Sequence, residues 1–439
     1  MTPGARLQAV IELLEQVWSG TTPADQVADA YFKRRRYAGS SDRRTINQRL
    51  YQVIRSRSRL DWWIERTGGA LSADARSRVI ANLALDDKFS PEQTQALCSG
   101  ANHCPTPLSP QELALADQLY GRPLTHRDMP GPVALEYPDW MERSFTALWG
   151  ARLETEISAL NHTAPLDLRV NALKATREQA QASLAADLID TEPTPLSPLG
   201  LRLPNKPRLG GTQAFRQGLV EVQDEGSQIL ALLCGAEPEM HVVDFCAGAG
   251  GKTLALAASM AESGHLRGQL TACDISELRL GRMQPRLQRA GVTGVRTQTL
   301  SAQSDKWVKK NKGRWDRVLC DVPCTGTGAW RRDPDAKWRF QPTDLDDIRN
   351  TQRTILTQAA SLVKPGGRLI YATCSLLQEE NEQQLAWFFE TDERFQALSV
   401  DGVWAETVGG PPPPPAPCLR LSPASTGTDG FFAAILERL

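Results

Sequence analysis

The sequence predicts an α/β protein that ends in a doubly wound, mostly parallel sheet, with a small α+β module and an all-helical domain before it. After about Asp224, short apolar segments alternate with helical patterns. Continuous apolar strands with helical crossovers are typical of a parallel sheet covered on both faces. Before about residue 125, apolar residues recur at helical spacing and strand signals are scarce. The 439 residues, of which 41% are hydrophobic, can form two or three such domains.

Residues 1–125 are the predicted helical domain, and apolar positions follow helical spacing in residues 7–18 and 46–54. The domain also holds a basic patch, because ten lysines and arginines between Lys33 and Arg59 stand against the single acid Asp42. The formal net charge of -1 conceals this patch. Such a cluster is the usual footprint for a phosphate backbone, but a solvated helix face has the same composition, and charge alone leaves both open. The candidate phosphate contacts are Arg34, Arg35, Arg36, Arg43 and Arg44.

A proline-rich linker over residues 105–132 leads into a predicted α+β module at residues 134–225. The module combines a β-prone segment at 165–171 with a helical segment at 177–184 and later strand-like segments near 200 and 218.

The third predicted domain covers residues 226–439 and contains the doubly wound sheet. Its strands are expected at residues 241–245, 269–273, 295–300, 317–321, 368–373 and 431–436. Its helices are expected to start near Thr253, Ser276, Thr343 and Glu379. Lys364-Pro-Gly-Gly367 is a good stop for the third of these helices, because proline cannot continue the turn and glycine tolerates the left-handed cap. The proline-rich residues 409–417 should form a stiff loop before the last strand.

A glycine-rich turn follows the first of these strands, in Val243-Asp-Phe-Cys-Ala-Gly-Ala-Gly-Gly-Lys-Thr253. Its glycines let the backbone approach a ligand, and the helix start leaves N–H groups free to bond it. Two phosphate-binding patterns fail, because Cys246 and Thr253 stand where those patterns need glycine or a small residue. Asp274 ends the next strand, where a carboxylate can bond ribose hydroxyls, although a helix cap is the alternative. A nucleoside without a phosphate fingerprint suggests S-adenosylmethionine.

The candidate cofactor contacts are therefore Cys246, Ala247, Gly248, Ala249, Gly250, Gly251, Lys252 and Asp274.

Two of the nine cysteines are candidates for chemistry. Cys234, Cys246, Cys273 and Cys320 lie in apolar runs and fit small buried hydrophobes better, although Cys246 is beside the glycine-rich turn. Cys324 and Cys374 each follow a predicted strand on the side where open α/β sheets bind ligands, and each enters a polar turn. Asp321 lies close enough in sequence to converge with Cys324. A thiolate that adds to C6 of cytosine makes C5 nucleophilic toward a sulfonium methyl group. A second acid/base group can then assist loss of the C5 proton and release of the thiolate.

Several motifs together resemble the RsmB-like (Sun/NSUN) RNA 5-methylcytosine methyltransferases. They are Asp244 to Thr253, Asp321 to Gly328, Arg331 to Trp338, Tyr371 to Ser375 with Glu379 to Asn381, and Asp429 to Phe432. The resemblance covers roughly residues 135–439. The helical amino-terminal part is similar to the NusB-like domain of bacterial members, through Asp42 to Arg44 and Tyr51 to Trp62.

The resemblance implies a class I, Rossmann-like S-adenosylmethionine-dependent domain that methylates C5 of a cytidine in structured RNA, with ribosomal RNA favoured. It implies that Cys374 is the nucleophile, that Cys324 assists product release, that Asp321 bonds the target ring or the cofactor, and that Lys252 lines the transfer site. Transfer RNA as the substrate and an assembly factor with a decayed catalytic domain are the alternatives. The family's Gly-Asp pair after the third strand is absent: Gln298-Thr-Leu-Ser301 stands there, and the nearest acid is Asp305.

A basic-aromatic turn follows Cys324 and supplies further candidates for RNA contact, namely Arg331, Arg332, Lys337 and Trp338. A salt-bridged surface loop is the alternative for this turn. Arg169 and Asn171 are similar candidates in the α+β module. Because C6 is hidden inside a duplex, we expect an unpaired or flipped-out cytidine.

The remaining features point to a monomeric, cytoplasmic protein without a metal or a membrane anchor. The amino-terminal segment lacks the apolar core of a signal peptide, and no apolar run is long enough to span a bilayer. Cys98, His103 and Cys104 have no second cluster that would complete a tetrahedral metal site.

Overall fold

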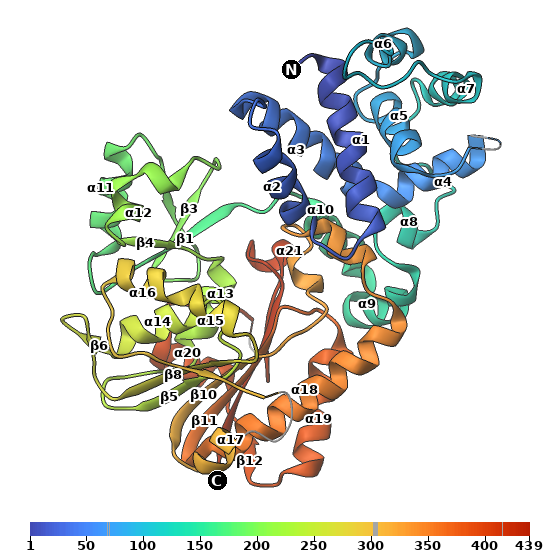
Figure 1. Ribbon diagram of the computed structural model, residues 1–439. Helices are drawn as coiled ribbons and strands as arrows, with labels where there is room; N and C mark the ends of the chain where they lie inside the picture. Colours follow the sequence, from blue (N-terminus) through green and yellow to red (C-terminus); the bar gives the residue numbers. More distant parts are fainter. Residues whose placement is uncertain (68, 70, 302–305, 415) are drawn as a thin grey trace. The chain divides into compact units, whose positions relative to one another are not determined.

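The computed structural model describes residues 1–67, 69, 71–301, 306–414 and 416–439 (Figure 1). The chain divides into two compact units. The first comprises Met1–His162 together with Trp330–Gln341, and the second comprises Thr163–Ala329 together with Pro342–Leu439. A short segment that follows the Cys324 loop in sequence therefore packs with the amino-terminal unit.

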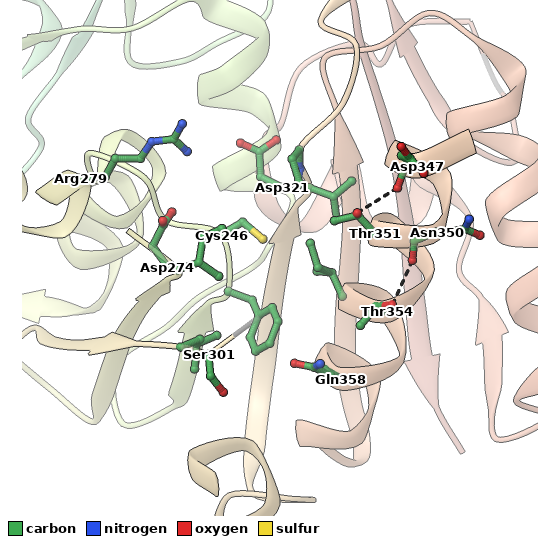
Figure 2. A pocket seen from close by; sticks show the side chains of 16 residues that line it. Cys246, Asp274, Arg279, Ser301, Asp321, Asp347, Asn350, Thr351, Thr354 and Gln358 are labelled. Carbon is green, nitrogen blue, oxygen red and sulfur yellow. Dashed lines mark hydrogen bonds between the residues drawn. The ribbon is translucent and has the colours of Figure 1, made fainter. Parts of the chain in front are cut away.

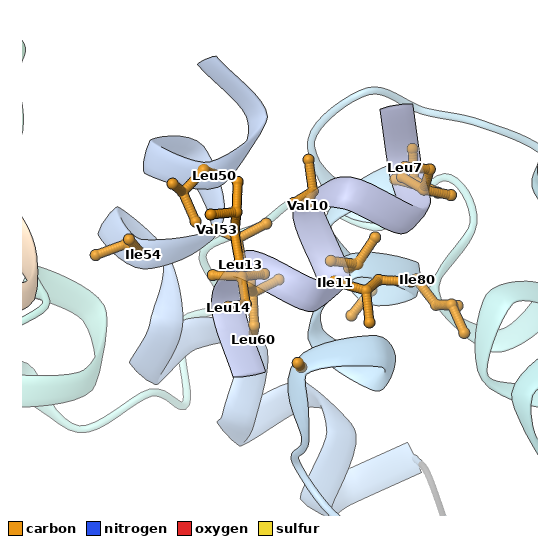
Figure 3. Packing of buried hydrophobic residues seen from close by; sticks show 14 of the residues in the cluster. Leu7, Val10, Ile11, Leu13, Leu14, Leu50, Val53, Ile54, Leu60 and Ile80 are labelled. Atoms are coloured by element: carbon orange, nitrogen blue, oxygen red, sulfur yellow. The ribbon is translucent and has the colours of Figure 1, made fainter. Parts of the chain in front are cut away.

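The first unit is helical, as predicted. Its α-helices are α1 (Pro3–Ser19), α2 (Ala24–Arg34), α3 (Ser40–Arg55), α4 (Arg57–Thr67), α5 (Ala75–Leu85), α6 (Pro91–Leu97), α7 (Pro110–Leu119), α8 (Gly131–Leu135), α9 (Glu142–Trp149) and α10 (Leu153–Asn161). Figure 3 shows Leu13 of α1 beside Leu50 and Val53 of α3, and Ile11 of α1 beside Ile80 of α5. The helical spacing of these apolar side chains places them on one face of each helix, which creates the core.

The segment Trp330–Gln341 is anchored to this unit by its large side chains. It contains a short 3-10 helix, η5 (Pro334–Trp338). Trp330 is 1% exposed, and its ring meets Phe145 edge-on, with 5.8 Å between the ring centroids. Burial of these aromatic surfaces holds the segment in place.

The second unit begins with a small antiparallel sheet in the order β2-β3-β1-β4. Its elements are β1 (Leu166–Val170), α11 (Arg177–Ala186), β2 (Glu192–Pro193), β3 (Gly200–Leu203), α12 (Gln213–Arg216) and β4 (Val220–Val222). Leu168 pairs with Leu201 on one side and with Val222 on the other. The sheet and α11 share one apolar cluster, which includes Leu168, Leu184 and Leu201.

The main sheet has eight strands in the order β12-β14-β11-β10-β5-β8-β9, with β13 paired to β14. The strands are β5 (His241–Asp244), β8 (Gln269–Asp274), β9 (Arg296–Thr299), β10 (Trp315–Asp321), β11 (Val363–Thr373), β12 (Phe395–Ala397), β13 (Leu419–Leu421) and β14 (Phe431–Arg438). A separate hairpin joins β6 (Ala261–Glu262) and β7 (His265–Leu266). The strands β9, β8, β5, β10 and β11 are parallel, and β14 is antiparallel to β11. The predicted doubly wound sheet is confirmed, with an antiparallel edge added.

Helices cover both faces of this sheet (Figure 1). They are α13 (Glu225–Leu232), α14 (Gly251–Met260), α15 (Glu277–Gly281), α16 (Met283–Ala290), α17 (Lys306–Lys310), α18 (Pro342–Leu362), α19 (Glu382–Thr391), α20 (Val400–Thr407) and α21 (Pro423–Thr426). Val242 belongs to the cluster shared with α13, α14 and α20, whereas its neighbour Val243 belongs to the cluster shared with α18 and α19. Successive strand residues thus point to opposite faces, and both faces are apolar.

Several details differ from the expected elements. The expected linker over residues 105–132 contains α7, and the helical unit extends to His162. The proline-rich loop does not lead directly into the last strand, because β13 and α21 intervene. The third helix ends at Leu362, just before the predicted stop at Lys364. Within the described residues, no helix is both long and apolar enough to cross a membrane.

Candidate active site

The parallel strands bring the two candidate cysteines together. Asp321 at the end of β10 pairs with Ala372 near the end of β11, so the loops that follow these strands leave the sheet side by side. The Sγ atoms of Cys324 and Cys374 lie 3.3 Å apart, and both side chains are half-buried. Both cysteines are free thiols. The predicted convergence of two strand-end thiols is therefore present in the geometry.

Close backbone contacts tie three loops together at this point. The N–H of Gly328 donates to the carbonyl of Cys374 at 2.9 Å, and the N–H of Gly430 donates to the carbonyl of Gly328 at 2.8 Å. A Cβ atom on Gly328 would meet the Gly430 carbonyl oxygen at 2.1 Å. Only glycine permits this approach, so the loops after β10 and β11 and the turn before β14 form one rigid edge.

The environment of Cys324 favours its neutral thiol. The hydrogen bond with Cys374 and burial raise the pKa of Cys324 well above its ordinary value. A neutral thiol at this position can donate its S–H toward the Cys374 sulfur.

Lys252 and Asp321 form an ion pair beside the thiols. The Lys252 Nζ lies 2.7 Å from Oδ2 of Asp321. Burial alone would lower the pKa of Lys252, but the negative charge of Asp321 and their hydrogen bond outweigh it and raise the pKa. The Lys252 side chain is therefore an ammonium group, fixed at the start of α14.

A cavity of about 760 Å³ opens at the same end of the sheet (Figure 2). Its volume is in the range of small-molecule and cofactor sites. Cys246, Asp274 and Asp321 line it, and they are three of the predicted cofactor contacts. The predicted residues Ala247 to Lys252 follow Cys246 directly and form the turn into α14.

The glycine turn has the conformation that close approach to a nucleoside requires. Gly248 has φ 55° and Gly250 has φ 82°, both in the left-handed region. A Cβ on Gly250 would also meet Met283 at 2.4 Å, whereas the space beside Gly248 is open. The Gly248 N–H donates to Oδ2 of Asp274 at 2.8 Å, which joins the turn to the end of β8. These features fit an S-adenosyl cofactor held by a backbone turn and a strand-end carboxylate.

Asp274 is not the cap of the helix that follows it. Ser276 caps α15, and its side chain accepts a hydrogen bond from the Arg279 N–H. Oδ1 of Asp274 instead accepts from the Ser276 N–H at 2.8 Å. Each carboxylate oxygen retains acceptor capacity, so Asp274 can also bond ribose hydroxyls.

Two buried groups near the turn have raised pKa values. The hydrogen bond with Cys320 and then burial raise the pKa of Cys246 well above its ordinary value, which favours a neutral thiol at the cavity wall. Burial raises the pKa of Asp244 to about 7, opposed by the hydrogen bond from Thr253 and reinforced by repulsion from Asp321. The Thr253 hydroxyl donates to Oδ2 of Asp244 at 2.6 Å, while Oδ1 of Asp244 has no hydrogen-bond partner.

The far wall of the cavity is a polar face of α18, which the sequence analysis missed. Figure 2 shows Asn350, Thr351, Thr354 and Gln358 along this face. Their spacing of three or four residues was the available signal, because it predicts a polar stripe on a helix that covers a sheet. Ser301, at the end of the Gln298-Thr-Leu-Ser301 segment, lines the cavity, and Asp305 lies outside the described residues.

The structure gives Arg169 and Asn171 roles inside the second unit instead of exposing them to RNA. Arg169 is 5% exposed and donates to the carbonyl of Gly251 at 2.9 Å. Asn171 donates to the carbonyls of Gly218 and Ala290 at 3.0 and 2.9 Å. Their hydrogen bonds brace the glycine turn and the small sheet, so structural roles replace the RNA contacts predicted for Arg169 and Asn171.

The basic-aromatic turn is also largely engaged within its own unit. Lys337 is 1% exposed and donates to the Glu136 carbonyl at 3.0 Å and to the Asn161 side chain. Burial lowers the pKa of Lys337 to about 7. Arg331 is 5% exposed, and the half-buried Trp338 ring lies 5.2 Å from the Arg57 guanidinium. Of these candidates, only Arg332 is exposed, and Lys337 is corrected to a buried anchor of the segment.

Two arginines of the basic patch on the helical unit are engaged in contacts within that unit. Arg35 pairs with Glu12 at 3.0 Å, and Arg43 donates to the Ala38 carbonyl at 2.8 Å. Arg34, Arg36 and Arg44 remain exposed.

Sequence comparisons match two family profiles to this chain. Residues 231–437 match the profile described as 16S rRNA methyltransferase RsmB/F. Residues 137–209 match the ferredoxin-like domain of RsmF/B-like methyltransferases.

Curated relatives extend the match to about two thirds of the chain. A probable ribosomal RNA small subunit methyltransferase B from Synechocystis is 33% identical over 304 residues, which are 69% of this chain and 67% of that protein. Ribosomal RNA small subunit methyltransferase B from Sodalis glossinidius is 34% identical over 298 residues, 68% of this chain and 65% of that protein. The matched region thus spans about two thirds of these relatives.

Solved structures share the fold. The crystal structure of PH0851 superposes with a TM-score of 0.78 and 24% identity, covering 100% of this chain and 99% of that one. A methyltransferase homolog from Pyrococcus horikoshii has a TM-score of 0.59 and 26% identity, covering 70% of this chain and 97% of that one. The profile and relative matches place the chain in the RsmB/F family of S-adenosylmethionine-dependent methyltransferases.

Proposed function

We propose that this protein methylates C5 of an unpaired cytidine in RNA through a transient covalent bond between Cys374 and C6. The observation that carries the proposal is the pair of thiols 3.3 Å apart at the ligand-binding edge of the sheet. A cofactor cavity and the Lys252–Asp321 ion pair lie at the same edge. Small-subunit ribosomal RNA is the proposed substrate, because the matched relatives are named for that activity.

The proposed reaction uses the two thiols in sequence. The Cys374 thiolate forms a bond to C6, and the electron pair of the C5–C6 double bond makes C5 nucleophilic. S-adenosylmethionine, when bound, supplies an electrophilic methyl group for C5. The C5 proton then leaves to a base, the double bond re-forms, and the C6–S bond breaks to return the Cys374 thiolate. Cys324 assists this last stage, because its sulfur lies beside that of Cys374.

Asp321 and Lys252 are proposed to orient the reactants. Asp321 is partly exposed to the cavity and can bond the target ring or the cofactor. Lys252 holds that carboxylate in place through their hydrogen bond at 2.7 Å. The exposed Arg34, Arg36 and Arg44 of the helical unit and Arg332 are the proposed phosphate contacts.

Replacing the proposed nucleophile tests the covalent step. Cys374→Ala should lower kcat on the RNA substrate by at least about a thousandfold, since the addition to C6 has no substitute. Binding of the cofactor, measured by calorimetry, should stay near the wild-type value. Cys418→Ala, at a half-buried cysteine before β13, is the matched control and should leave turnover unchanged. Unchanged turnover in Cys374→Ala would refute the proposed role.

Replacing the second thiol tests the release step. Cys324→Ala should still form the bond to C6 and transfer the methyl group, but should lose the product slowly. Enzyme and RNA should then remain joined as a band that resists denaturant in gel electrophoresis. If Cys324→Ala turns over normally and no such band forms, the roles of the two thiols are misassigned. Bisulfite sequencing of ribosomal and transfer RNA from cells with and without the gene would identify the modified base.

A further inference from the structure

A buried carboxylate lies beneath the two cysteine loops. Glu380 ends the short 3-10 helix η6 (Gln378–Glu380) that follows β11, and it is 0% exposed. Its Oε1 accepts hydrogen bonds from the Thr325 N–H at 2.9 Å and from the Gln352 side chain at 3.0 Å. Its Oε2 accepts from the hydroxyls of Thr325 and Ser375. One carboxylate thus gathers four donors from three separate segments.

These donors are the immediate neighbours of the two thiols. Thr325 follows Cys324, and Ser375 follows Cys374. Gln352 of α18 donates to the Pro323 carbonyl as well as to Glu380, both at 3.0 Å, so the residue before Cys324 is held too. The loop after β10 is therefore fixed on both sides of its cysteine.

The neighbouring Asn381 fixes the second loop in the same way. Its Oδ1 accepts from the Thr373 hydroxyl at 2.6 Å, and its Nδ2 donates to the Ser375 carbonyl at 2.9 Å. Thr373 and Ser375 flank Cys374, and all three polar partners are 0% exposed. A densely hydrogen-bonded buried network of this kind favours a single arrangement.

We propose that Glu380 is a positioning residue that sets the separation of Cys324 and Cys374 through its hydrogen bonds, and not through its charge. The proposal rests on the proposed function, in which both thiols react in turn. It deepens that function because a nucleophile and its partner must be held within a fraction of an ångström to act together. The Glu379-Glu-Asn381 segment of the sequence thereby gains a role that its position in the chain alone did not reveal.

The chemistry of the four donors explains why hydrogen bonding, and not charge, is required. Burial raises the pKa of Glu380, although its four donors act in the opposite direction. Two of the donors are hydroxyls, which can rotate to accept instead. A glutamine at this position can accept from the Thr325 N–H and Gln352 with its carbonyl oxygen and donate to both hydroxyls with its amide. Glu380→Gln therefore keeps the network, whereas Glu380→Ala removes it.

The rate of disulfide formation between the two thiols measures their separation without RNA or cofactor. Oxidised glutathione would accept the two electrons and give two molecules of reduced glutathione, while Cys324 and Cys374 lose their protons and form one S–S bond. Peptide mapping would quantify that bond among the nine cysteines. Glu380→Gln should form it within about threefold of the wild-type rate, and Glu380→Ala at least about tenfold more slowly. Alkylation of Cys418 and the affinity for S-adenosylmethionine should be the same in all three proteins.

Turnover should follow the same order, with kcat lowered in Glu380→Ala and KM for RNA little changed. Two milder variants keep the test decisive where Glu380→Ala fails to fold. Ser375→Ala and Thr325→Val each remove one hydroxyl and should each slow disulfide formation. Wild-type cross-linking in Glu380→Ala, or in both milder variants, would overturn the proposal. Glu380→Gln as impaired as Glu380→Ala would overturn it too, because the charge would then be essential.

The two proposals fail separately. A wild-type enzyme that does not methylate cytidine, with the order of cross-linking rates intact, would overturn the proposed function alone. Normal methylation with equal cross-linking rates in all variants would overturn only the role of Glu380.

Discussion

The buried carboxyl group of Asp244, beside the glycine turn, makes the stability of the folded protein depend on pH. It is 1% exposed at the end of β5, and one of its oxygens has no hydrogen-bond partner. Burial therefore raises its pKa to about 7 from an ordinary value of 3.8. Between those two values the folded protein keeps the proton while the unfolded chain has lost it. The folded state thus binds more protons in this window, so stability falls as the pH rises.

Asp244→Asn should remove this pH dependence, because its amide is neutral at every pH and can still accept from Thr253. The contribution of Asp244 is present in full below pH 3.8 and is lost progressively as the pH rises through about 7. We therefore expect the stability of the variant relative to the wild type, measured from urea midpoints, to be greater at about pH 8 than at about pH 5. The increase should be roughly 1–3 kcal/mol. An equal difference between the two proteins at both pH values would contradict the assigned pKa.

The contacts in the loops at the carboxyl ends of the strands could not be predicted from the sequence alone. The strands themselves were predictable, since β5, β8 and β10 are short apolar runs and both faces of the sheet are covered. Their order placed Cys324 and Cys374 at one edge. The hydrogen bonds of Glu380 were not predictable as a set, because Gln352 of α18 and Thr325 of the loop after β10 lie 28 and 55 residues away in sequence. Periodicity reports which face a residue occupies, but not which distant donor it meets.

The contact between Gly328 and Gly430 makes the rigidity of this edge testable. In Gly328→Ala the new methyl group would collide with the Gly430 backbone, which has no flexible side chain that could move aside. We expect a loss of about 1–3 kcal/mol in stability and at least about a tenfold fall in kcat, because the Cys374 carbonyl is bonded to the same residue. Thermal unfolding and single-turnover methylation would measure the two effects.

Gly402→Ala is the matched control for this change. Gly402 lies inside α20 with nothing within 4 Å of an added Cβ. Alanine favours the helix over glycine, so the variant should be as stable as the wild type or more stable by up to about 1 kcal/mol, with normal kcat. If Gly328→Ala behaves like Gly402→Ala, the edge is not rigid.

Within the helical unit, the distribution of charge differs from its appearance in the sequence. Between Lys33 and Arg59 the cations have one acid among them, yet acids from other parts of the unit pair with them. Arg35 meets Glu12, Arg49 meets Asp87, and Arg59 meets Glu136. A count of charges over one stretch of sequence omits the acids that folding brings close to that stretch. The same limit explains why the sequence predicted Lys337 to contact RNA.

The cations that stay exposed should supply the electrostatic part of RNA binding. Replacing Arg34, Arg36 and Arg44 together by alanine removes up to three phosphate contacts and releases fewer counterions on binding. The slope of log Kd against log salt should therefore fall in magnitude by about 2–3, measured by fluorescence anisotropy with a structured RNA.

The matched control replaces Lys309, Lys310 and Lys312 together by alanine. These lysines are exposed in the second unit, and their replacement changes the net charge by the same amount. That control should keep the wild-type slope, as should Lys337→Met, because the Lys337 ammonium is buried. Equal loss of slope in the arginine and lysine variants would mean that RNA responds to net charge and not to this patch.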